Sequence, residues 1–281
     1  MKELKAMSKI KILQAQINVP EQKTEARQIL ENVCEKAAQE GADLVTLPEM
    51  FCCPYDNACF PVYAEEEGGD MWQACSDAAK KYGIWLSAGS MPERRSDGRI
   101  YNTAYVFDRE GRQQAKHCKM HLFDIDIEGG QHFHESDTLS RGNSVTVFDT
   151  DFGRVGLCIC YDFRFPELGR LMALKGAEII VVPGAFNLST GPKHWELMFR
   201  AQAMFNQCYC IGTAPARNMQ ASYHSWGHSI VTDPWGAVVN QMDEKERIQI
   251  TEIDMDLVSE VRSQLPLLKH RRDDIYELRT L

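Results

Sequence analysis

The chain has 281 residues, with 31 basic against 40 acidic side chains and a formal net charge of −9. This balance argues against nonspecific binding to nucleic acid or to anionic membranes. No apolar run approaches the about 18 residues of a membrane span, and the segment Met1–Lys9 has no long apolar stretch behind it, so we expect no signal peptide. The ten cysteines are expected to stay reduced in a cytoplasmic protein.

The first half of the chain predicts strands and helices in alternation. Strands are predicted at residues 8–18, 43–49, 84–89, 101–107 and 112–118, and helices over about 21–40 and about 66–81. The last two strands predict a hairpin around Arg109–Gly111. Residues 119–143 form a long connection rich in His and Asp, and loops of that length inside a compact domain are usually functional.

The second half continues the alternation. Strands are predicted at residues 145–148, 154–159, 179–182, 208–213 and 248–253, with helices from Pro166, over 194–205 and after Asp254. A loop is expected at 185–193 and a hairpin across Asp233–Gly236. Because no repeat or linker interrupts this order, we expect a single α/β domain over 1–281, of which roughly 256–281 is a C-terminal helix and tail.

The stretch Gly156–Leu168 carries the first candidate for chemistry. Apolar residues alternate up to Ile159, as in a buried strand ending near Cys160, and Pro166 and Glu167 suit the first turn of a helix. A cysteine at such a turn can face a pocket. Helix-end amides and a nearby cation would lower its pKa toward the nucleophilic thiolate. The residues alone leave a buried structural cysteine as the alternative.

Two charged residues also follow directly on apolar strands. Glu49 follows Leu-Val-Thr-Leu-Pro, and burial would raise the pKa of its carboxyl toward neutrality, which suits a general base. Lys119 follows the strand that ends at Cys118, where a fixed positive charge could stabilise an oxyanion. An ordinary loop glutamate and a solvated lysine are the alternatives. Spacing alone does not distinguish Lys119 from Lys116.

Three short motifs, in this order, resemble those of the carbon–nitrogen hydrolase (nitrilase) superfamily, and the resemblance covers nearly the whole chain. They are Leu47–Glu49, Lys119–Asp124 and Cys158–Asp162. Within the superfamily the chain resembles the Nit-type amidases, and most closely the ω-amidases. This likeness rests on the blocks Glu49–Tyr55, Phe60–Glu65, His121–Ile127, Glu135–Ser136, Pro183–Pro192, His194–Leu197 and Ser225–Ser229.

The resemblance implies a four-layer α-β-β-α sandwich that carries a Glu–Lys–Cys triad and needs neither cofactor nor metal. Glu49 would be the base and Cys160 the nucleophile that forms a thioester. Lys119 and the backbone amide of Tyr161 would hold the oxyanion. A second glutamate assists in similar enzymes; the matching residue is Glu135, which could hold Lys119 or a water. The family also implies a homodimer or a higher homo-oligomer.

The substrate class follows from the same resemblance. The nucleophile lies in Cys-Tyr-Asp rather than the Cys-Trp-Glu of nitrile hydrolases, which favours amides. The ω-amidases act on monoamides of short dicarboxylic acids, such as 2-oxoglutaramate or succinamate, so we expect a small carboxylate-bearing amide as the partner. Arg164 is the nearest candidate cation, with Tyr55 and Phe186 as pocket walls. A structural pair of Arg164 with Glu167 or Asp162 is the alternative.

Other activities remain open alternatives. Residues 160–168 resemble the neighbouring amidases of deaminated glutathione, and N-carbamoyl amine hydrolysis could use the same triad. Gln202 and Phe205 stand where the family often carries an Arg and an acid, which bears on local packing and the subunit contact.

A different class of protein, a metal-binding module, is suggested by several Cys and His residues, but none shows Cys-x-x-Cys spacing. They are Cys52, Cys53, Cys59, His117, Cys118, His121, His132, His134, Cys208 and Cys210. Cys208 and Cys210 lie two apart on a predicted strand, so both would face one side and suit a core as small apolar residues. We expect the same of Cys158.

Overall fold

The computed structural model describes residues 8–128 and 132–281. The strands are β1 (Lys9–Gln16), β2 (Leu44–Thr46), β3 (Trp85–Ser87), β4 (Met91–Arg94), β5 (Ile100–Phe107), β6 (Gln113–Cys118), β7 (Asp124–Asp126), β8 (His132–His134), β9 (Thr146–Thr150), β10 (Gly153–Leu157), β11 (Ile179–Pro183), β12 (Tyr209–Thr213), β13 (Ile230–Thr232), β14 (Val238–Gln241) and β15 (Arg247–Asp254). The helices are α1 (Lys23–Gln39), α2 (Phe60–Tyr63), α3 (Asp70–Tyr82), α4 (Pro166–Leu174), α5 (Gly191–Asn206) and α6 (Asp256–Gln264).

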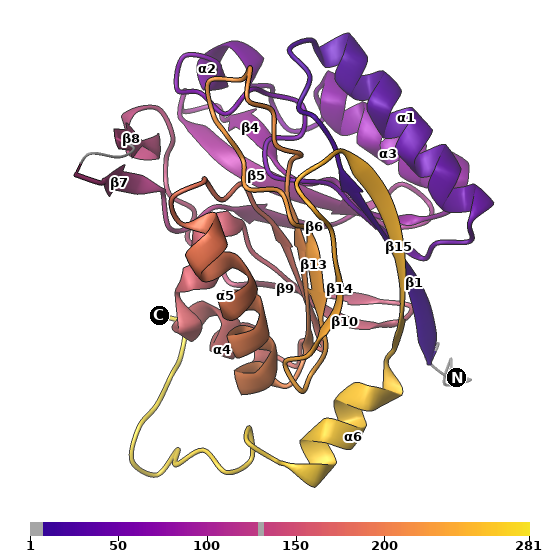
Figure 1. Ribbon diagram of the computed structural model, residues 1–281, viewed down its shortest axis with the longest axis vertical. Helices are drawn as coiled ribbons and strands as arrows, with labels where there is room; N and C mark the ends of the chain where they lie inside the picture. The colour runs from indigo at the N-terminus through magenta and orange to yellow at the C-terminus, as the bar shows by residue number, and fades with distance from the viewer. Residues whose placement is uncertain (1–7, 129–131) are drawn as a thin grey trace.

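The long strands form two sheets that pack face to face. The first has the order β15-β1-β2-β3-β5-β4, with β6 also paired to β5, and the second has the order β14-β13-β12-β11-β10-β9. In Figure 1, α1 and α3 cover the outer side of the first sheet, while α4 and α5 lie on the far side of the second. The layers are therefore helix, sheet, sheet and helix, as the resemblance to the carbon–nitrogen hydrolases implies. The hairpin β7–β8 forms a separate small sheet.

Strand β1 shows why the sequence gives two cores. Ile10 and Ile12 belong to the core that includes the space between the sheets, whereas Leu13 and Ala15 pack with α1 and α3. Side chains of a strand point alternately to its two faces, so one strand serves both cores. Each fully buried aliphatic side chain contributes about 1.5–3 kcal/mol to the burial term. Gln14 faces inward and its Nε2 donates to the Gly212 carbonyl at 2.9 Å, which links the two sheets.

Several boundaries differ from those predicted. Strand β4 and helix α2 are absent from the sequence prediction, and the connection 119–143 contains the hairpin β7–β8. Helix α5 begins at Gly191 rather than His194. The Gly191-Pro192 pair suggested a loop, but proline suits a first helical turn, where its missing amide hydrogen would have no partner.

Three expectations from the sequence concern membrane-spanning helices, a signal peptide and disulfides. No helix in 8–128 or 132–281 is long and apolar enough to cross a membrane. Residues 1–7, on which the expectation of no signal peptide mainly rests, lie outside the described residues. The ten cysteines, all of them in the described ranges, form no disulfide.

Candidate active site

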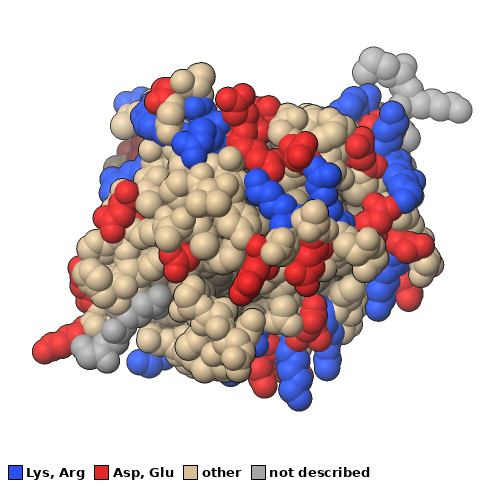
Figure 2. Space-filling model, turned by 90° about the horizontal axis from the view of Figure 1, so that it is seen from above, with Lys and Arg blue, Asp and Glu red and all other residues tan. Residues whose placement is uncertain are grey.

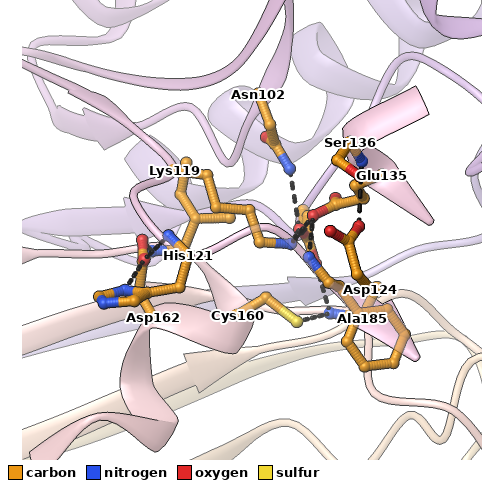
Figure 3. A network of polar contacts seen from close by, with 12 residues as sticks. Asn102, Lys119, His121, Asp124, Glu135, Ser136, Cys160, Asp162 and Ala185 are labelled. Atoms are coloured by element: carbon orange, nitrogen blue, oxygen red, sulfur yellow. Dashed lines mark hydrogen bonds and ion pairs between the residues drawn. The ribbon is translucent and has the colours of Figure 1, made fainter. Parts of the chain in front are cut away.

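The four residues predicted to be catalytic all follow the ends of strands. Glu49 lies three residues beyond β2, and Lys119 directly follows β6. Glu135 directly follows β8, and Cys160 opens the 3-10 turn η2 (Cys160–Arg164), just beyond β10. All four side chains are buried. Figure 3 shows the Cys160 sulfur directed at the backbone of Ala185 and the Lys119 ammonium directed at Glu135. The fold thus brings together residues from across the first 160 positions of the sequence.

Lys119 lies between two buried glutamates. Its Nζ is 2.8 Å from Oε1 of Glu49 and 2.9 Å from Oε2 of Glu135. Burial alone would lower the pKa of Lys119, but the negative charges of Glu135 and Glu49 outweigh burial and raise it. The ammonium is therefore permanently charged, as a stabiliser of an oxyanion must be. Of the two roles suggested for Glu135, the contact with Lys119 is the one observed.

Glu49 is held by three donors. Its Oε1 accepts from Lys119 and, at 2.9 Å, from Nδ2 of Asn102, while its Oε2 accepts from the Ala185 backbone N–H at 2.9 Å. Burial raises the pKa of the Glu49 carboxyl, and the charge of Lys119 only partly offsets this. The direction agrees with the sequence-based expectation, and it suits a group that must accept and return a proton.

The expectation that the pKa of the Cys160 thiol is lowered is wrong. Burial first and then the nearby Glu49 carboxylate raise the pKa of the Cys160 thiol well above its usual value, and the opposing influence of Lys119 is smaller. The resting group is therefore a thiol, and a base must remove its proton. The Ala185 N–H donates to Sγ of Cys160 at 3.4 Å, and the thiol is hydrogen-bonded to Glu49.

Cys160 also has an unusual backbone conformation. Its φ of 48° lies in the left-handed region, which costs a residue with a side chain about 1–3 kcal/mol and persists only where surrounding contacts hold it. Such strain is common at functional sites. Here it turns the chain sharply between strand β10 and helix α4, so the thiol faces Ala185.

Glu135 connects the buried cluster of Glu49, Lys119 and Cys160 to Tyr55, a predicted wall of the pocket. Its Oε1 accepts from the Tyr55 hydroxyl at 2.6 Å, and its Oε2 accepts from the Phe123 backbone N–H at 2.7 Å. The Tyr55 ring lies 4.6 Å from that of Tyr223, centroid to centroid. A cavity of about 520 Å³ reaches this cluster, lined by residues that include Glu49, Tyr55, Ala185 and Tyr223. Tyr55 is thus both a wall of the cavity and a donor to Glu135.

Arg164 lies beside Cys160, in a narrow space that Tyr161 and Phe186 also line. Its guanidinium carbon is 4.3 Å from the centroid of the Phe186 ring, and its Nη1 is 2.9 Å from Nδ1 of His194. Within the described residues its buried Nε has no hydrogen-bond partner, and no ion pair joins it to Asp162 or Glu167. The structural pairing offered as an alternative for Arg164 is therefore not observed.

Sequence reasoning missed two contributors to this site. Asn102 donates to Glu49 from strand β5, and its signal would have been an amide side chain in a strand of mostly apolar residues. Asp162 is fully buried and bonded to His117 and His121. It was considered only as a partner for Arg164. Nothing local to the Cys-Tyr-Asp motif predicts contacts with residues about 40 positions earlier.

The Cys and His residues of the metal-binding alternative do not assemble into one site. His117 and His121 both contact Asp162, while Cys208 and Cys210 are buried side by side, with Sγ atoms 3.9 Å apart. The part of the chain that the structure describes contains one group with three ligand atoms within 4.8 Å of one another. It comprises Asp126, His132 and His134 on the outer hairpin β7–β8 and is largely solvent-exposed.

The chain was compared with families and with proteins of known sequence. Residues 9–263 match the family described as carbon–nitrogen hydrolase. A hydrolase of Schizosaccharomyces pombe is 50% identical over 243 residues, 86% of this chain and 75% of the relative. Omega-amidase NIT2-A of Xenopus laevis is 45% identical over 272 residues, 97% of this chain and 98% of the relative. Omega-amidase NIT2 of Homo sapiens is 47% identical over 241 residues, 86% of this chain and 87% of the relative.

Two solved structures are also similar to this chain. Nit3 of Saccharomyces cerevisiae, described as a member of branch 10 of the nitrilase superfamily, superposes with a TM-score of 0.87 at 40% identity, covering 95% of this chain and 98% of its own. The NitFhit protein of C. elegans superposes with a TM-score of 0.90 at 34% identity, covering 97% of this chain and 67% of its own.

Proposed function

Because this chain belongs to the carbon–nitrogen hydrolase family, we propose that it hydrolyses the terminal amide of a small carboxylate-bearing substrate and releases ammonia. Relatives 45–47% identical over most of the chain are named omega-amidases. The observation that carries the proposal is the contact of both Glu49 and the Cys160 thiol with the Ala185 N–H, beside the buried Lys119. These residues supply a base, a nucleophile and a fixed cation in one buried cluster.

In the first half of the reaction, Glu49 takes the thiol proton as Cys160 attacks the amide carbon. The carbonyl oxygen becomes an oxyanion, which Lys119 and the backbone N–H of Tyr161 stabilise. Glu49 then returns the proton to the leaving nitrogen, and ammonia departs as the thioester forms. A base with a raised pKa suits this exchange, since it must both accept and donate a proton.

In the second half, water hydrolyses the thioester. Glu49 removes a proton from the water as it attacks the thioester carbon, and Lys119 again faces the developing oxyanion. The intermediate expels the Cys160 sulfur, which regains its proton from Glu49, and the carboxylic acid leaves. Glu135 contacts Lys119 and holds its ammonium in place to face the oxyanion.

We propose that Arg164 binds the substrate carboxylate, and the substitution Arg164→Met tests this. A charge-assisted hydrogen bond contributes about 1.5–3 kcal/mol, so KM for succinamate should rise by about 10- to 100-fold with little change in kcat. An uncharged amide such as butyramide should be hydrolysed equally by both proteins. Steady-state ammonia release measures both constants.

Arg170→Met is the matched control for this substitution. Arg170 lies on α4 and donates to the Phe205 carbonyl at 2.7 Å, so its removal changes the packing of the same region without facing Cys160. We expect near-normal KM values for this variant. If Arg164→Met lowered kcat/KM equally for charged and uncharged amides, Arg164 would not be the residue that recognises the carboxylate.

A substrate panel tests the activity itself. Product release should be compared for ω-monoamides, deaminated glutathione, N-carbamoyl amines and simple nitriles. We expect the highest kcat/KM for 2-oxoglutaramate or succinamate. A preference for N-carbamoyl amines or deaminated glutathione would overturn the substrate class while leaving the triad in place.

We also propose that the protein is a homodimer or a higher homo-oligomer. Large apolar side chains are exposed on α5 and the adjoining turn: Leu197 (67% exposed), Phe205 (50%) and Trp235 (45%). The turn lies against the helix, since Nε of Arg200 donates to the Gly236 carbonyl at 3.0 Å. Three large exposed apolar side chains on neighbouring segments favour an interaction site here. Sedimentation should show a wild-type dimer that Phe205→Glu weakens; a wild-type monomer would contradict the proposal.

We further propose that this single domain works in the cytoplasm without nucleic acid or membrane as a partner. The net charge of −9 supports this. On the face seen in Figure 2, acidic and basic side chains are mixed and separated by uncharged surface. A reducing compartment would also keep Cys160 in the thiol form that the mechanism requires. Fluorescence microscopy of the tagged protein in its own cells would test the location.

A further inference from the structure

One buried carboxylate joins the segment of the nucleophile to the segment of the catalytic lysine. Asp162 lies in turn η2, two residues after Cys160, and is fully buried. Its Oδ2 accepts from the backbone N–H of Ile159 at 3.1 Å. Its Oδ1 accepts from the backbone N–H groups of Met120 and His121, at 3.1 and 2.8 Å. The donors are thus the residue before the nucleophile and the two residues after the lysine.

Two histidines complete the surroundings of Asp162. Nε2 of His117 lies 2.9 Å from Oδ2, and Nδ1 of His121 lies 2.8 Å from Oδ1. Burial would raise the pKa of Asp162, but hydrogen bonds from His117 and His121 outweigh burial and hold it well below its usual range. The carboxylate therefore stays ionised and can only accept, so the ring nitrogens that face it carry protons. In Figure 3, His121 and Asp162 lie beside Lys119.

We propose that Asp162 is a positioning residue that fixes Cys160 relative to Lys119 and thereby sets the geometry of the thiol attack. Cys160 has a left-handed φ of 48°, which persists only where other contacts hold it. The hydrogen bond that Asp162 accepts from the Ile159 N–H fixes the residue directly before Cys160. Those that it accepts from Met120 and His121 fix the two residues directly after Lys119. This inference rests on the proposed roles of Cys160 and Lys119.

The substitution Asp162→Asn removes this link while nearly keeping the shape of the side chain. A carboxylate accepts at both oxygens, whereas an amide accepts at one and donates at the other. The NH₂ group would face N–H donors on one side or the other, so one of the two segments must move. A displacement of about 1 Å costs on the order of 100-fold in rate, so we expect kcat to fall about 100-fold with KM nearly unchanged.

Alkylation of Cys160 by iodoacetamide gives a readout that a merely structural role would not change. Its rate at several pH values, followed on the peptide that contains Cys160, reports the apparent pKa of the thiol. Lys119 lowers that pKa in the wild-type protein. When Asp162→Asn moves Lys119 away from Cys160, the midpoint of alkylation should therefore shift to higher pH.

Asp108→Asn is the matched control. Asp108 is also a buried carboxylate, and it accepts from the backbone N–H groups of Glu110 and Arg112 in the turn between β5 and β6. That turn precedes β6, whereas Lys119 follows the other end of the strand. We expect Asp108→Asn to lower thermal stability while leaving kcat and the alkylation midpoint unchanged. All assays are run below the melting transition of each variant.

The His121→Gln variant keeps the test decisive if Asp162→Asn does not fold. His121 is only partly buried, so this protein should fold and lose one of the five hydrogen bonds to Asp162. We expect the same pattern with a loss in kcat of about 10-fold. An unchanged kcat and alkylation midpoint in the folded variants, or equal changes in Asp108→Asn, would overturn the inference. Alkylation needs no substrate, so it remains decisive even if no amide is hydrolysed.

Discussion

Replacing Cys160 with alanine should abolish ammonia release from ω-monoamides while leaving the protein folded. Without the sulfur no thioester can form, and loss of a nucleophile typically lowers kcat by a factor on the order of 10⁴ or more. Alanine is smaller than cysteine and removes a buried thiol that makes only weak hydrogen bonds, so the fold should tolerate it. Ammonia release and thermal melting measure the two parts of this prediction. Retained turnover would refute the assignment of the nucleophile.

Cys158→Ala is the control that the chain itself offers. Cys158 is two residues earlier, is fully buried and belongs to the core between and around the sheets. Burial raises the pKa of its thiol well above its usual value. We expect kcat close to that of the wild-type protein. A loss comparable to that of Cys160→Ala would show that the two cysteines do not divide into one catalytic and one structural residue.

Replacing Lys119 with methionine should damage both activity and stability. The buried carboxylates of Glu49 and Glu135 would lose the ammonium between them. Breaking a buried ion pair by removing one partner typically costs about 3–5 kcal/mol in the free energy of unfolding. Loss of an oxyanion donor lowers kcat by about 10²–10³. Chemical denaturation and steady-state kinetics would measure the two effects.

The same substitution should shift the pH dependence of any remaining activity. Glu49 must be ionised to act as a base, so activity falls as pH drops through its pKa. Lys119 lowers this pKa in the wild-type protein, partly offsetting burial. Its removal should therefore move the acidic limb of the kcat/KM profile to higher pH. A limb that moves to lower pH would contradict the proposed contact between the base and the lysine.

Lys116→Met is the appropriate control for Lys119→Met. Lys116 pairs with Glu67 and Glu93 on the other face of strand β6 and is partly exposed. Glu93 is buried, but Nε of Arg95 also pairs with it at 3.3 Å, so this carboxylate keeps a cation when Lys116 is removed. We expect near-normal kcat and a smaller loss of stability than in Lys119→Met. The structure thus distinguishes the two lysines that sequence spacing could not.

The resemblance carried by three short motifs predicted the fold correctly, and the residues proposed to be catalytic lie close together in it. Strands with period two predict that Glu49, Lys119 and Cys160 follow strand ends. Each of the three belongs to one of the three motifs, and all three are buried. The predicted start of helix α5, His194, lies after its observed start, Gly191, because the glycine and proline there were interpreted as a loop. Local patterns of this kind leave boundaries open by a few residues.

The electrostatics of the site could not be predicted in the same way. The pKa of Cys160 is raised by its burial and by Glu49, which is 111 positions earlier. Likewise, Arg164 contacts His194 rather than the two acids nearest to it in sequence. Such quantities depend on long-range packing, which no periodicity of the chain reveals.

The most direct test of the account is to identify the covalent intermediate. The protein would be mixed with succinamate, quenched in acid within the first turnover and digested for mass spectrometry. We predict an acyl group with the mass of the substrate minus ammonia on the peptide that contains Cys160, and none in Cys160→Ala. Turnover with no acyl group on Cys160, or with the acyl group on another residue, would contradict the proposed mechanism.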